Sequence, residues 1–184
     1  MEWSTEGLKF GQVFANQIRR GLPAAGDKWH IDEIVIRISG IKHWPWRAVD
    51  QNGMVLDILV QSRRDTRAAK RLLRKLLKRQ FRASRVMMTD KLASYRAVKR
   101  EVMLSIKHRK HKGLNNRAEK SHQPTRQMKR FKSAGQAQRF LSAHDGINNL
   151  FHLRRHQVSA TQYRATRIQA FQVWAEITGV AASV

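Results

Sequence analysis

Three carboxylates, Asp32, Asp90 and Glu119, are the residues whose types and spacing could support chemistry on a phosphodiester. The chain has 184 residues but only 13 Asp and Glu residues, so few acids compete for this role. Carboxylate and water oxygens suit Mg²⁺ or Mn²⁺. Three converging carboxylates can hold two such ions, one at the attacking oxygen and one at the leaving oxygen. The pattern therefore predicts a two-metal phosphoryl-transfer site, with these acids as catalytic and metal-binding residues.

Asp32 has a structural explanation as well as a chemical one. Glu33 falls on the opposite side of the same predicted strand, whereas Asp32 shares its parity with Ile34, Ile36 and Ile38. A carboxylate buried on an apolar face needs a cation or hydrogen-bond donors. Alternatively, Asp32 is an acid at a strand end that stays hydrated.

The other acids also have alternatives. Asp90 ends a short apolar strand, where open sheets place ligands, but it could simply cap the helix that follows. Glu119 follows Asn116 by three residues and could be only the N3 member of a capping box. Asp57 is a rival acid, which we expect at a sheet edge, where its carboxylate reaches water. The combination of three acids on three elements favours the metal site.

The charge of the chain points to nucleic acid. Lys and Arg number 37 against 13 acids, a formal net charge of +24, which a polyanion would neutralise. A membrane surface is the weaker alternative. The stretch 107–130 contains Glu119 as its only acid, so we expect it to hold a phosphate backbone beside the metal ions. The predicted DNA-binding residues are Lys91, Lys107, Arg109, Lys110, Lys112, Asn116, Arg117, Lys120, Arg126, Lys129 and Arg130.

The predicted elements must bring these acids together. Period-two alternation predicts strands, and helical spacing of apolar residues predicts helices. The order is βββ-α-β-α-β-α followed by C-terminal helices, with strands at 29–38, 44–49, 55–61, 85–90 and 104–108 and helices at 66–79, 92–102, 116 onward, 134–153 and 161–178. Asn52-Gly53 predicts a type I′ hairpin, and 108–113 a basic loop. This is the order of the α/β, ribonuclease H-like fold, a mixed five-stranded sheet covered by helices.

Three domain segments follow from this order. Residues 1–28 are a linker or remnant, 29–133 the catalytic core and 134–184 a helical extension. The chain has no cysteine, no apolar signal-peptide core and no run of 18 apolar residues, so we expect a soluble, unsecreted protein. His108, His111 and His122 lack regular ligand spacing and are expected to face DNA or solvent.

Seven segments, in a fixed order, carry a resemblance to a known family. They are DKWHIDE (27–33), WRAVD (46–50), VLDILVQ (55–61), TDKL (89–92), NNRAE (115–119), HQPTR (122–126) and RFKSA (130–134). Over nearly all of residues 8 to 180 the chain resembles the insertion-sequence transposases of family six, bacterial DDE enzymes with a retroviral-integrase-like core. The resemblance assigns the two Asp residues to Asp32 and Asp90 and the Glu to Glu119. It also implies that Arg126, two helical turns after Glu119, contacts DNA, with the helix kinked or short near Pro124.

The resemblance implies a transposase that cleaves and joins DNA with Mg²⁺ or Mn²⁺ in the bacterial cytoplasm, associated with the nucleoid. Its partners would be transposon ends and target DNA, and it would be a homodimer when active, with no membrane and no small-molecule substrate. Relatives usually carry a helix-turn-helix region before Leu8 and additional residues between Arg126 and Met128, so this copy is expected to be truncated. The alternatives are an inactive, basic DNA-binding protein and a protein that acts on RNA.

Overall fold

The computed structural model describes residues 11, 13–18, 20, 25–81, 83–89, 106–110, 116–128, 131–152 and 158–179. Backbone contacts divide the chain into a unit of residues 25–138 and a unit formed by residues 1–24 and 139–184. The domain limits expected from the sequence stay predictions. The expected helix 92–102 lies outside the described residues, as do five of the predicted site residues, Asp90, Lys91, Lys112, Lys129 and Arg130.

The unit of residues 25–138 is built on a mixed sheet. Its strands are β1 (Lys28–Glu33), β2 (Ile36–Ile38), β3 (Ile41–Asp50), β4 (Val55–Gln61), β5 (Val86–Thr89) and β6 (Lys107–Lys110). They lie in the order β2-β3-β1-β5-β6, and β4 also pairs with β3. β3 is antiparallel to β1, β2 and β4, whereas β5 is parallel to β1 and to β6. Central β1, flanked by one antiparallel and one parallel neighbour, is the arrangement of the ribonuclease H-like fold, which confirms the predicted fold class.

The first predicted strand is interrupted and forms two strands, β1 and β2. The sheet therefore has six strands where five were expected. β1 ends at Glu33 and β2 begins at Ile36. The interruption lies opposite Pro45 of β3. Ile34 N–H donates to the Pro45 carbonyl at 3.2 Å, but Pro45 has no N–H to return the bond. The alternation of Ile36 and Ile38 therefore does not extend back to β1.

Tight turns connect β2 to β3 and β3 to β4. Ser39 and Gly40 join β2 to β3 with φ values of 50° and 80°, the positive pair that a type I′ turn requires. At the β3–β4 turn only Gly53 has positive φ, so the predicted type I′ turn at Asn52-Gly53 is wrong. Asp50 closes that loop instead, because its Oδ1 accepts from Asn52 N–H at 2.7 Å and from Met54 N–H at 3.0 Å.

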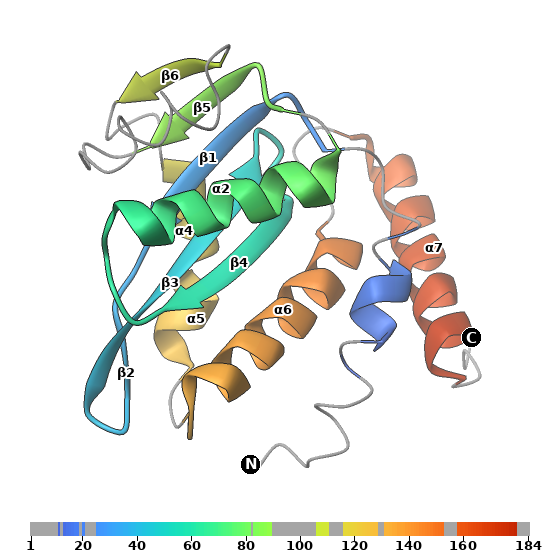
Figure 1. Ribbon diagram of the computed structural model, residues 1–184. Coiled ribbons are helices and arrows are strands. Elements are labelled where there is room, and N and C mark those ends of the chain that lie inside the picture. The colour runs from blue at the N-terminus through green and yellow to red at the C-terminus, as the bar shows by residue number, and fades with distance from the viewer. Residues whose placement is uncertain are drawn as a thin grey trace. The chain divides into compact units, whose positions relative to one another are not determined.

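Helix α2 (Thr66–Gln80) covers one face of the sheet (Figure 1). It begins as predicted, since the Asp65 side chain accepts from Ala68 N–H at 2.8 Å. Its apolar side chains pack against the sheet, and all are buried except Leu77, which is partly buried. One hydrophobic cluster joins α2 to the sheet. Its buried members are Trp29, Ile31, Trp46, Ala48, Leu56, Ala68, Ala69, Leu72, Leu73, Leu76, Met87 and Ile106. This cluster is the core of the unit.

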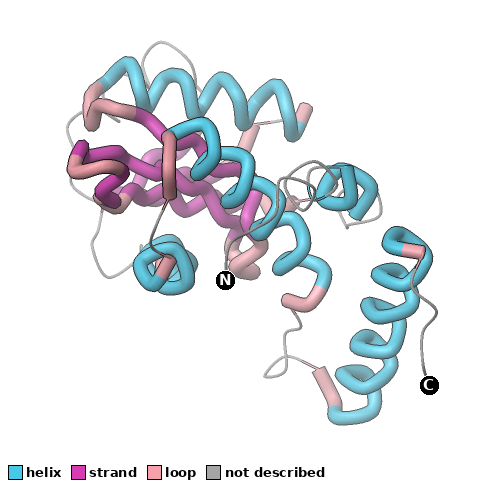
Figure 2. Tube along the Cα trace, turned by 90° about the horizontal axis from the view of Figure 1, so that it is seen from below, coloured by secondary structure: helices cyan, strands magenta, loops and turns pink. Residues whose placement is uncertain are grey.

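Two short helices, α4 (Asn116–Ser121) and α5 (Gln123–Gln127), follow β6. α4 packs against β1 and β3 on the sheet face opposite α2 (Figures 1 and 2). β1 is consequently buried on both faces from Trp29 to Glu33. A strand covered on both sides cannot reveal its faces by alternation, because no position is left exposed.

The C-terminal helices are α6 (Ala134–Leu150) and α7 (Ala160–Thr178). α7 begins with a capping box, in which Ser159 and Gln162 each accept from the other's backbone N–H. In the unit formed by residues 1–24 and 139–184, Phe151 packs on Phe171, with ring centroids 5.2 Å apart, and on Trp174, with ring centroids 6.2 Å apart. Among the described residues, no helix is long and apolar enough to cross a membrane.

Candidate active site

Asp32 occupies the face of β1 that α4 covers. Trp29 and Ile31 point into the core beneath α2, and successive strand residues point to opposite faces. Asp32 therefore lies on the other, polar face with His30. The expectation of an apolar face for Asp32 is wrong, because the isoleucines that suggested it belong to β2 or to the break before it. The Asp32 side chain is 10% exposed.

The Glu33 side chain, on the α2 side of the sheet, is buried and forms an ion pair. Its Oε1 is 2.6 Å from Arg64, whose guanidinium also lies over the Trp44 ring at 5.5 Å. The Glu33 side chain is fully buried, whereas that of Arg64 is 39% exposed. Glu33 is thus a structural carboxylate whose charge is matched by a cation from the loop before α2. The sequence contained no local sign of this partner.

His122 joins Asp32 to the helix that carries Glu119. Its Nε2 lies 3.2 Å from the backbone carbonyl of Asp32 and 4.0 Å from the Asp32 carboxylate. Its backbone N–H donates to the Glu119 carbonyl at 3.2 Å. The side chain is fully buried, so the prediction that His122 faces DNA or solvent is wrong. A strand residue and a helix residue far apart in sequence are thereby held together.

Burial and charge keep His122 neutral. Desolvation, followed by the positive charge of Arg47, lowers the pKa of His122 from 6.5 to about 3. In the neutral ring one nitrogen donates, and the nearby Asp32 carbonyl makes Nε2 the donor. Asp32 therefore has an uncharged imidazole as a neighbour at neutral pH.

Arg47 is the buried residue that sequence reasoning missed. It is the Cα partner of Asp32 on β3 and is 1% exposed. Its guanidinium donates to the Ser121 carbonyl and, at 2.7 Å, to the Thr125 hydroxyl. Arg47 thus fastens the end of α4 and the middle of α5 to the sheet. The sequence signal that could have identified Arg47 as buried was its position inside a predicted strand of mostly apolar residues.

Glu119 lies in the first turn of α4 and is half-buried. Beside it, Ala118 is fully buried, while Asn116 and Lys120 are exposed. α4 ends at Ser121 and α5 begins at Gln123, so the predicted helix break near Pro124 occurs. Arg126 is exposed on α5 and does not continue the helix of Glu119 as a simple two-turn repeat would.

The ends of β1 and β5 meet at this site. Their parallel register pairs Ile31 with Thr89. Asp32 follows Ile31, and Asp90, which follows Thr89, lies outside the described residues. Thr89 Oγ1 is 2.9 Å from His108 Nε2 on the neighbouring β6.

β6 includes residues 108–110 of the predicted basic loop and residues 107–108 of the strand expected at 104–108, and the rest of both ranges except Ile106 lies outside the described residues. It runs parallel to β5, and half-buried His108 is bound within the sheet rather than solvated. His111 lies outside the described residues. Lys107 and Arg109 are exposed, and the register places Arg109 in line with Met88 and His30. Since His30 and Asp32 share a face of β1, Arg109 belongs to the sheet face of Asp32. Lys110 and Arg117 lie on β6 and α4, respectively.

The rival acid, Asp57, is structural. Its Oδ1 is 2.9 Å from Lys75 and 2.7 Å from Arg79, both on α2. The Asp57 side chain is fully buried, so the expectation that it reaches water at the sheet edge is wrong. β4 does lie at an edge, but α2 extends over it.

The described part of the chain contains no group of three His, Cys, Asp or Glu side chains that could hold a metal ion. Two of the three expected ligands, Asp32 and Glu119, come from elements in contact, β1 and α4. Their oxygens fit Mg²⁺ or Mn²⁺, and the neutral His122 adds no charge that would oppose a cation. The donor set is therefore compatible with the expected metal.

Comparison with known proteins agrees with this geometry. The sequence profile of the DDE domain family matches residues 26–154. The transposase for insertion sequence-like element IS431mec of Staphylococcus aureus strain Mu50 is 32% identical over 130 residues. That alignment covers 67% of this chain and 58% of the transposase, so the chain spans less than two thirds of the relative's length. The transposase for IS257 in transposon Tn4003 of S. aureus gives the same values.

A structural likeness is also found. The catalytic domain of Mos1 mariner transposase aligns with 97% of this chain and 95% of its own, at 14% identity and a TM-score of 0.49. The fold assignment rests instead on the strand order and register above. With its profile match and the agreement with the transposases of insertion-sequence family six, the chain belongs to the DDE domain family.

Proposed function

We propose that this chain is a DNA transposase that cleaves and joins phosphodiesters with Asp32, Asp90 and Glu119 as its metal-binding catalytic residues. The supporting observation is the parallel register of β1 and β5, which pairs Ile31 with Thr89. Asp32 follows Ile31 on β1, and Asp90 is the residue after Thr89 in the sequence. This pairing supports the proposal that the two carboxylates share metal ions.

Glu119 reaches the same region through α4. His122 contacts the Asp32 carbonyl and the Glu119 carbonyl, and Arg47 fixes the end of α4 beside Asp32. These contacts support the proposal that Asp32 and Glu119 lie near one another. Arg47 is engaged by Ser121 and Thr125, which directs its guanidinium toward the helices.

The chemistry is an in-line displacement by water or a DNA 3′-hydroxyl, without a covalent protein intermediate. Two bound Mg²⁺ or Mn²⁺ ions would supply activation of the attacking oxygen and neutralise charge on the leaving oxygen. The exposed Lys107, Arg109, Lys120 and Arg126 would bind the phosphate backbone, with Asn116 at the start of α4. We propose the same role for the other predicted basic residues, Lys91, Lys110, Lys112, Arg117, Lys129 and Arg130.

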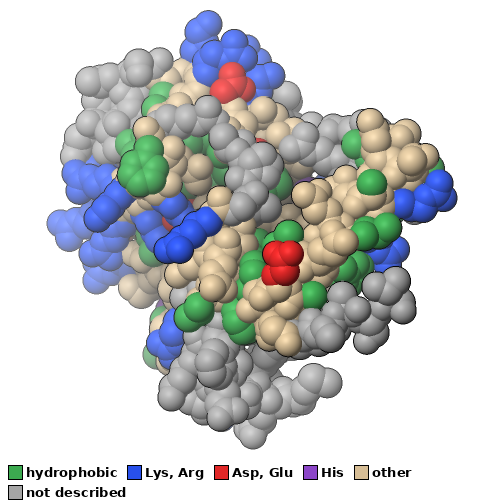
Figure 3. Space-filling model, turned by 90° about the vertical axis from the view of Figure 1, so that its right-hand side faces the viewer, with side chains coloured by type: hydrophobic (Ala, Val, Ile, Leu, Met, Phe, Trp, Pro, Cys, Tyr) green, Lys and Arg blue, Asp and Glu red, His purple; other side chains and the backbone are tan. Residues whose placement is uncertain are grey.

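We further propose that transposon ends and target DNA are the partners, that the active form is a homodimer, and that the protein works beside the nucleoid in the bacterial cytoplasm. The high net charge of +24 supports a polyanionic partner. On the space-filling surface, Lys and Arg form several groups, while Asp and Glu show only as small isolated areas of the visible face (Figure 3).

The test is a strand-transfer assay with pre-cleaved DNA ends and Mg²⁺ or Mn²⁺. Asp32→Asn and Glu119→Gln should each lower the rate about 10³-fold or more, since charge stabilisation by metals contributes several kcal/mol. Glu176→Gln, at an exposed position on α7, is the control and should keep the wild-type rate. A wild-type chain that binds DNA but shows no metal-dependent reaction would favour the DNA-binding alternative. Cleavage of RNA in preference to DNA would favour the RNA alternative.

A further inference from the structure

Helix α2 carries a row of exposed cations on the sheet face opposite Asp32. Arg67, Arg71, Arg74 and Lys78, here called the α2 stripe, are all exposed. Their spacing of four, three and four residues places them on one side of the helix. At 1.5 Å per residue the stripe extends about 16 Å. Phosphates on one strand of a duplex advance about 3.4 Å each along the axis, so the stripe matches about five of them.

The basic composition of α2 destabilises this helix when no polyanion is bound. Residues 66–80 include no Asp or Glu. Arg67 and Arg71 are four residues apart, as are Arg74 and Lys78, and like charges at this spacing destabilise a helix. Lys75 and Arg79, by contrast, serve the fold by pairing with Asp57. A polyanion bound along the stripe would relieve this repulsion.

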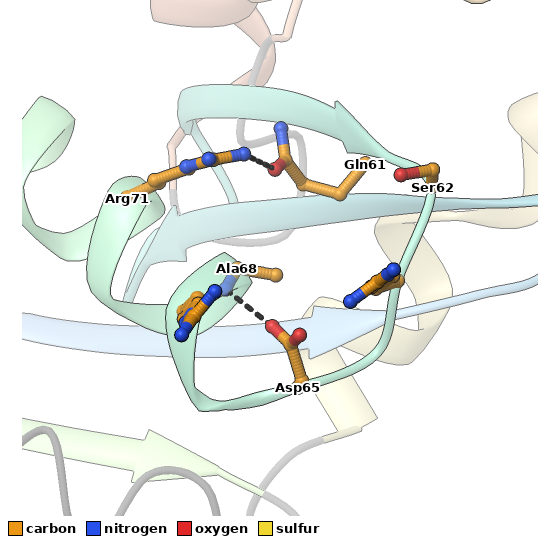
Figure 4. A pocket seen from close by; sticks show the side chains of 7 residues that line it. Gln61, Ser62, Asp65, Ala68 and Arg71 are labelled. Atoms are coloured by element: carbon orange, nitrogen blue, oxygen red, sulfur yellow. Dashed lines mark hydrogen bonds between the residues drawn. The ribbon is translucent and has the colours of Figure 1, made fainter.

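A hollow of about 190 Å³ lies at the beginning of the stripe. Three arginines contribute to its lining, which consists of Gln61, Ser62, Arg63, Asp65, Arg67, Ala68 and Arg71 (Figure 4). Arg71 donates to Gln61 Oε1 at 3.0 Å, and the Asp65 carboxylate accepts from Ala68 N–H. The helix N-terminus is thus occupied by its own cap. Guanidinium groups suit phosphate oxygens, so these three arginines are the groups that would hold a phosphate in this hollow.

We infer that the α2 stripe binds the phosphate backbone of a second DNA segment, separate from the segment at Asp32 and Glu119. The identification of the bound polyanion as DNA rests on the proposed function. A membrane surface fits poorly, because the apolar side chains of α2 are buried in the core and cannot enter a bilayer. Pairing with α2 of a second copy would bring two like-charged stripes together. The two faces of the sheet would then hold two duplexes, one at each side.

The experiment measures equilibrium binding of full-length protein to a duplex of unrelated sequence, in EDTA, over a range of salt. The quadruple variant R67Q/R71Q/R74Q/K78Q should lower the slope of log affinity against log salt by up to about 3.6, because each phosphate contact contributes about 0.9. With short duplexes of about 12 base pairs, native mass spectrometry should detect two bound duplexes on the wild type and one on the variant.

The control removes the same number of charges elsewhere. R37Q/K42Q/R164Q/R167Q changes four exposed residues outside α2 and should alter the slope by less than about 1. R67K/R71K/R74K keeps the charge and should retain both duplexes. Equal losses in the two quadruple variants, an unchanged stoichiometry, or a preference of the stripe for anionic vesicles over DNA would overturn the inference. Because no metal is present, a failure of strand transfer leaves these results unaffected, so the two proposals fail separately.

Discussion

The two faces of the sheet hold their buried carboxylates in different ways. On the α2 face, Glu33 is 2.6 Å from Arg64, and Asp57 is within 3 Å of both Lys75 and Arg79. On the α4 face, the Asp32 carboxylate lies 4.0 Å from His122, which is neutral because its pKa is lowered to about 3. Burial alone therefore does not identify a structural acid, whereas a direct ion pair with a cation, as at Glu33 and Asp57, does.

The largest change in stability is expected from the acid with two cations. Asp57→Asn should lower the free energy of unfolding by about 3 kcal/mol, because it leaves two partly buried cations without their buried carboxylate. The partial exposure of Lys75, at 38%, and of Arg79, at 21%, limits the loss. Urea denaturation of the metal-free protein measures it.

Two variants control this result. Asp27→Asn breaks the exposed pair with Arg85, at 2.9 Å, and should cost about 0.5 kcal/mol or less. Asp32→Asn should change the stability of the metal-free protein by less than about 1 kcal/mol, because His122 bonds to the backbone carbonyl of Asp32, which the substitution keeps. If Asp32→Asn costs as much as Asp57→Asn, the two faces do not differ as described.

A smaller effect is expected at Arg47, which connects the sheet to α4 and α5. Arg47→Lys keeps the charge but cannot reproduce the two hydrogen bonds to Ser121 and Thr125, so we expect a loss of about 2 kcal/mol in unfolding free energy. Hydrogen exchange should rise in α4 and α5 while α2 keeps its protection. Equal loss of protection in α2 would show that Arg47 supports the whole core rather than the α4 face.

The smallest effect is a pH dependence that belongs to His122. The folded protein keeps the ring neutral down to about pH 3, whereas the unfolded chain binds a proton below about 6.5. The contribution of neutral His122 to the free energy of unfolding is complete above pH 6.5, and it is lost progressively as the pH falls towards 3. Between pH 7.5 and 5.5 the expected loss is about 1.4 kcal/mol. Urea denaturation in EDTA should show it in the wild type and not in His122→Gln.

The exposed His152→Gln is the control and should retain the wild-type pH dependence. A wild-type stability that is flat over this pH range would show that His122 is not held neutral beside Asp32. Asp32 would then lack the uncharged neighbour on which the comparison of the two faces depends.

Local patterns in the sequence predicted the elements whose causes are local. Asp65 caps α2 as expected, the apolar spacing of α2 predicts its buried side, and β4 has the predicted limits at Val55 and Gln61. The antiparallel pairing of β3 with β2 and with β4 follows from the turns that connect them. These features depend on neighbours within a few residues, which a sequence displays directly.

The errors arose where the cause lies far along the chain. Pro45 interrupts the ladder opposite Ile34, so the parity assigned to Asp32 failed. Asp57 is covered by α2 and matched by Lys75 and Arg79, and His122 is buried against a strand 90 residues earlier. No spacing rule connects such partners, because the fold alone brings them into contact. Asp32 and Glu119 could be proposed as a pair only from the order of elements and the family resemblance.

The central claim is that Asp32, Asp90 and Glu119 share divalent ions, and anomalous diffraction from crystals soaked in Mn²⁺ tests it most directly. We expect two peaks at the end of β1 and β5, about 3.5–4 Å apart and bridged by these three carboxylates. Both peaks should weaken in Asp32→Asn. Ions bound elsewhere, or an Asp90 carboxylate too distant to share an ion with Asp32, would contradict the claim.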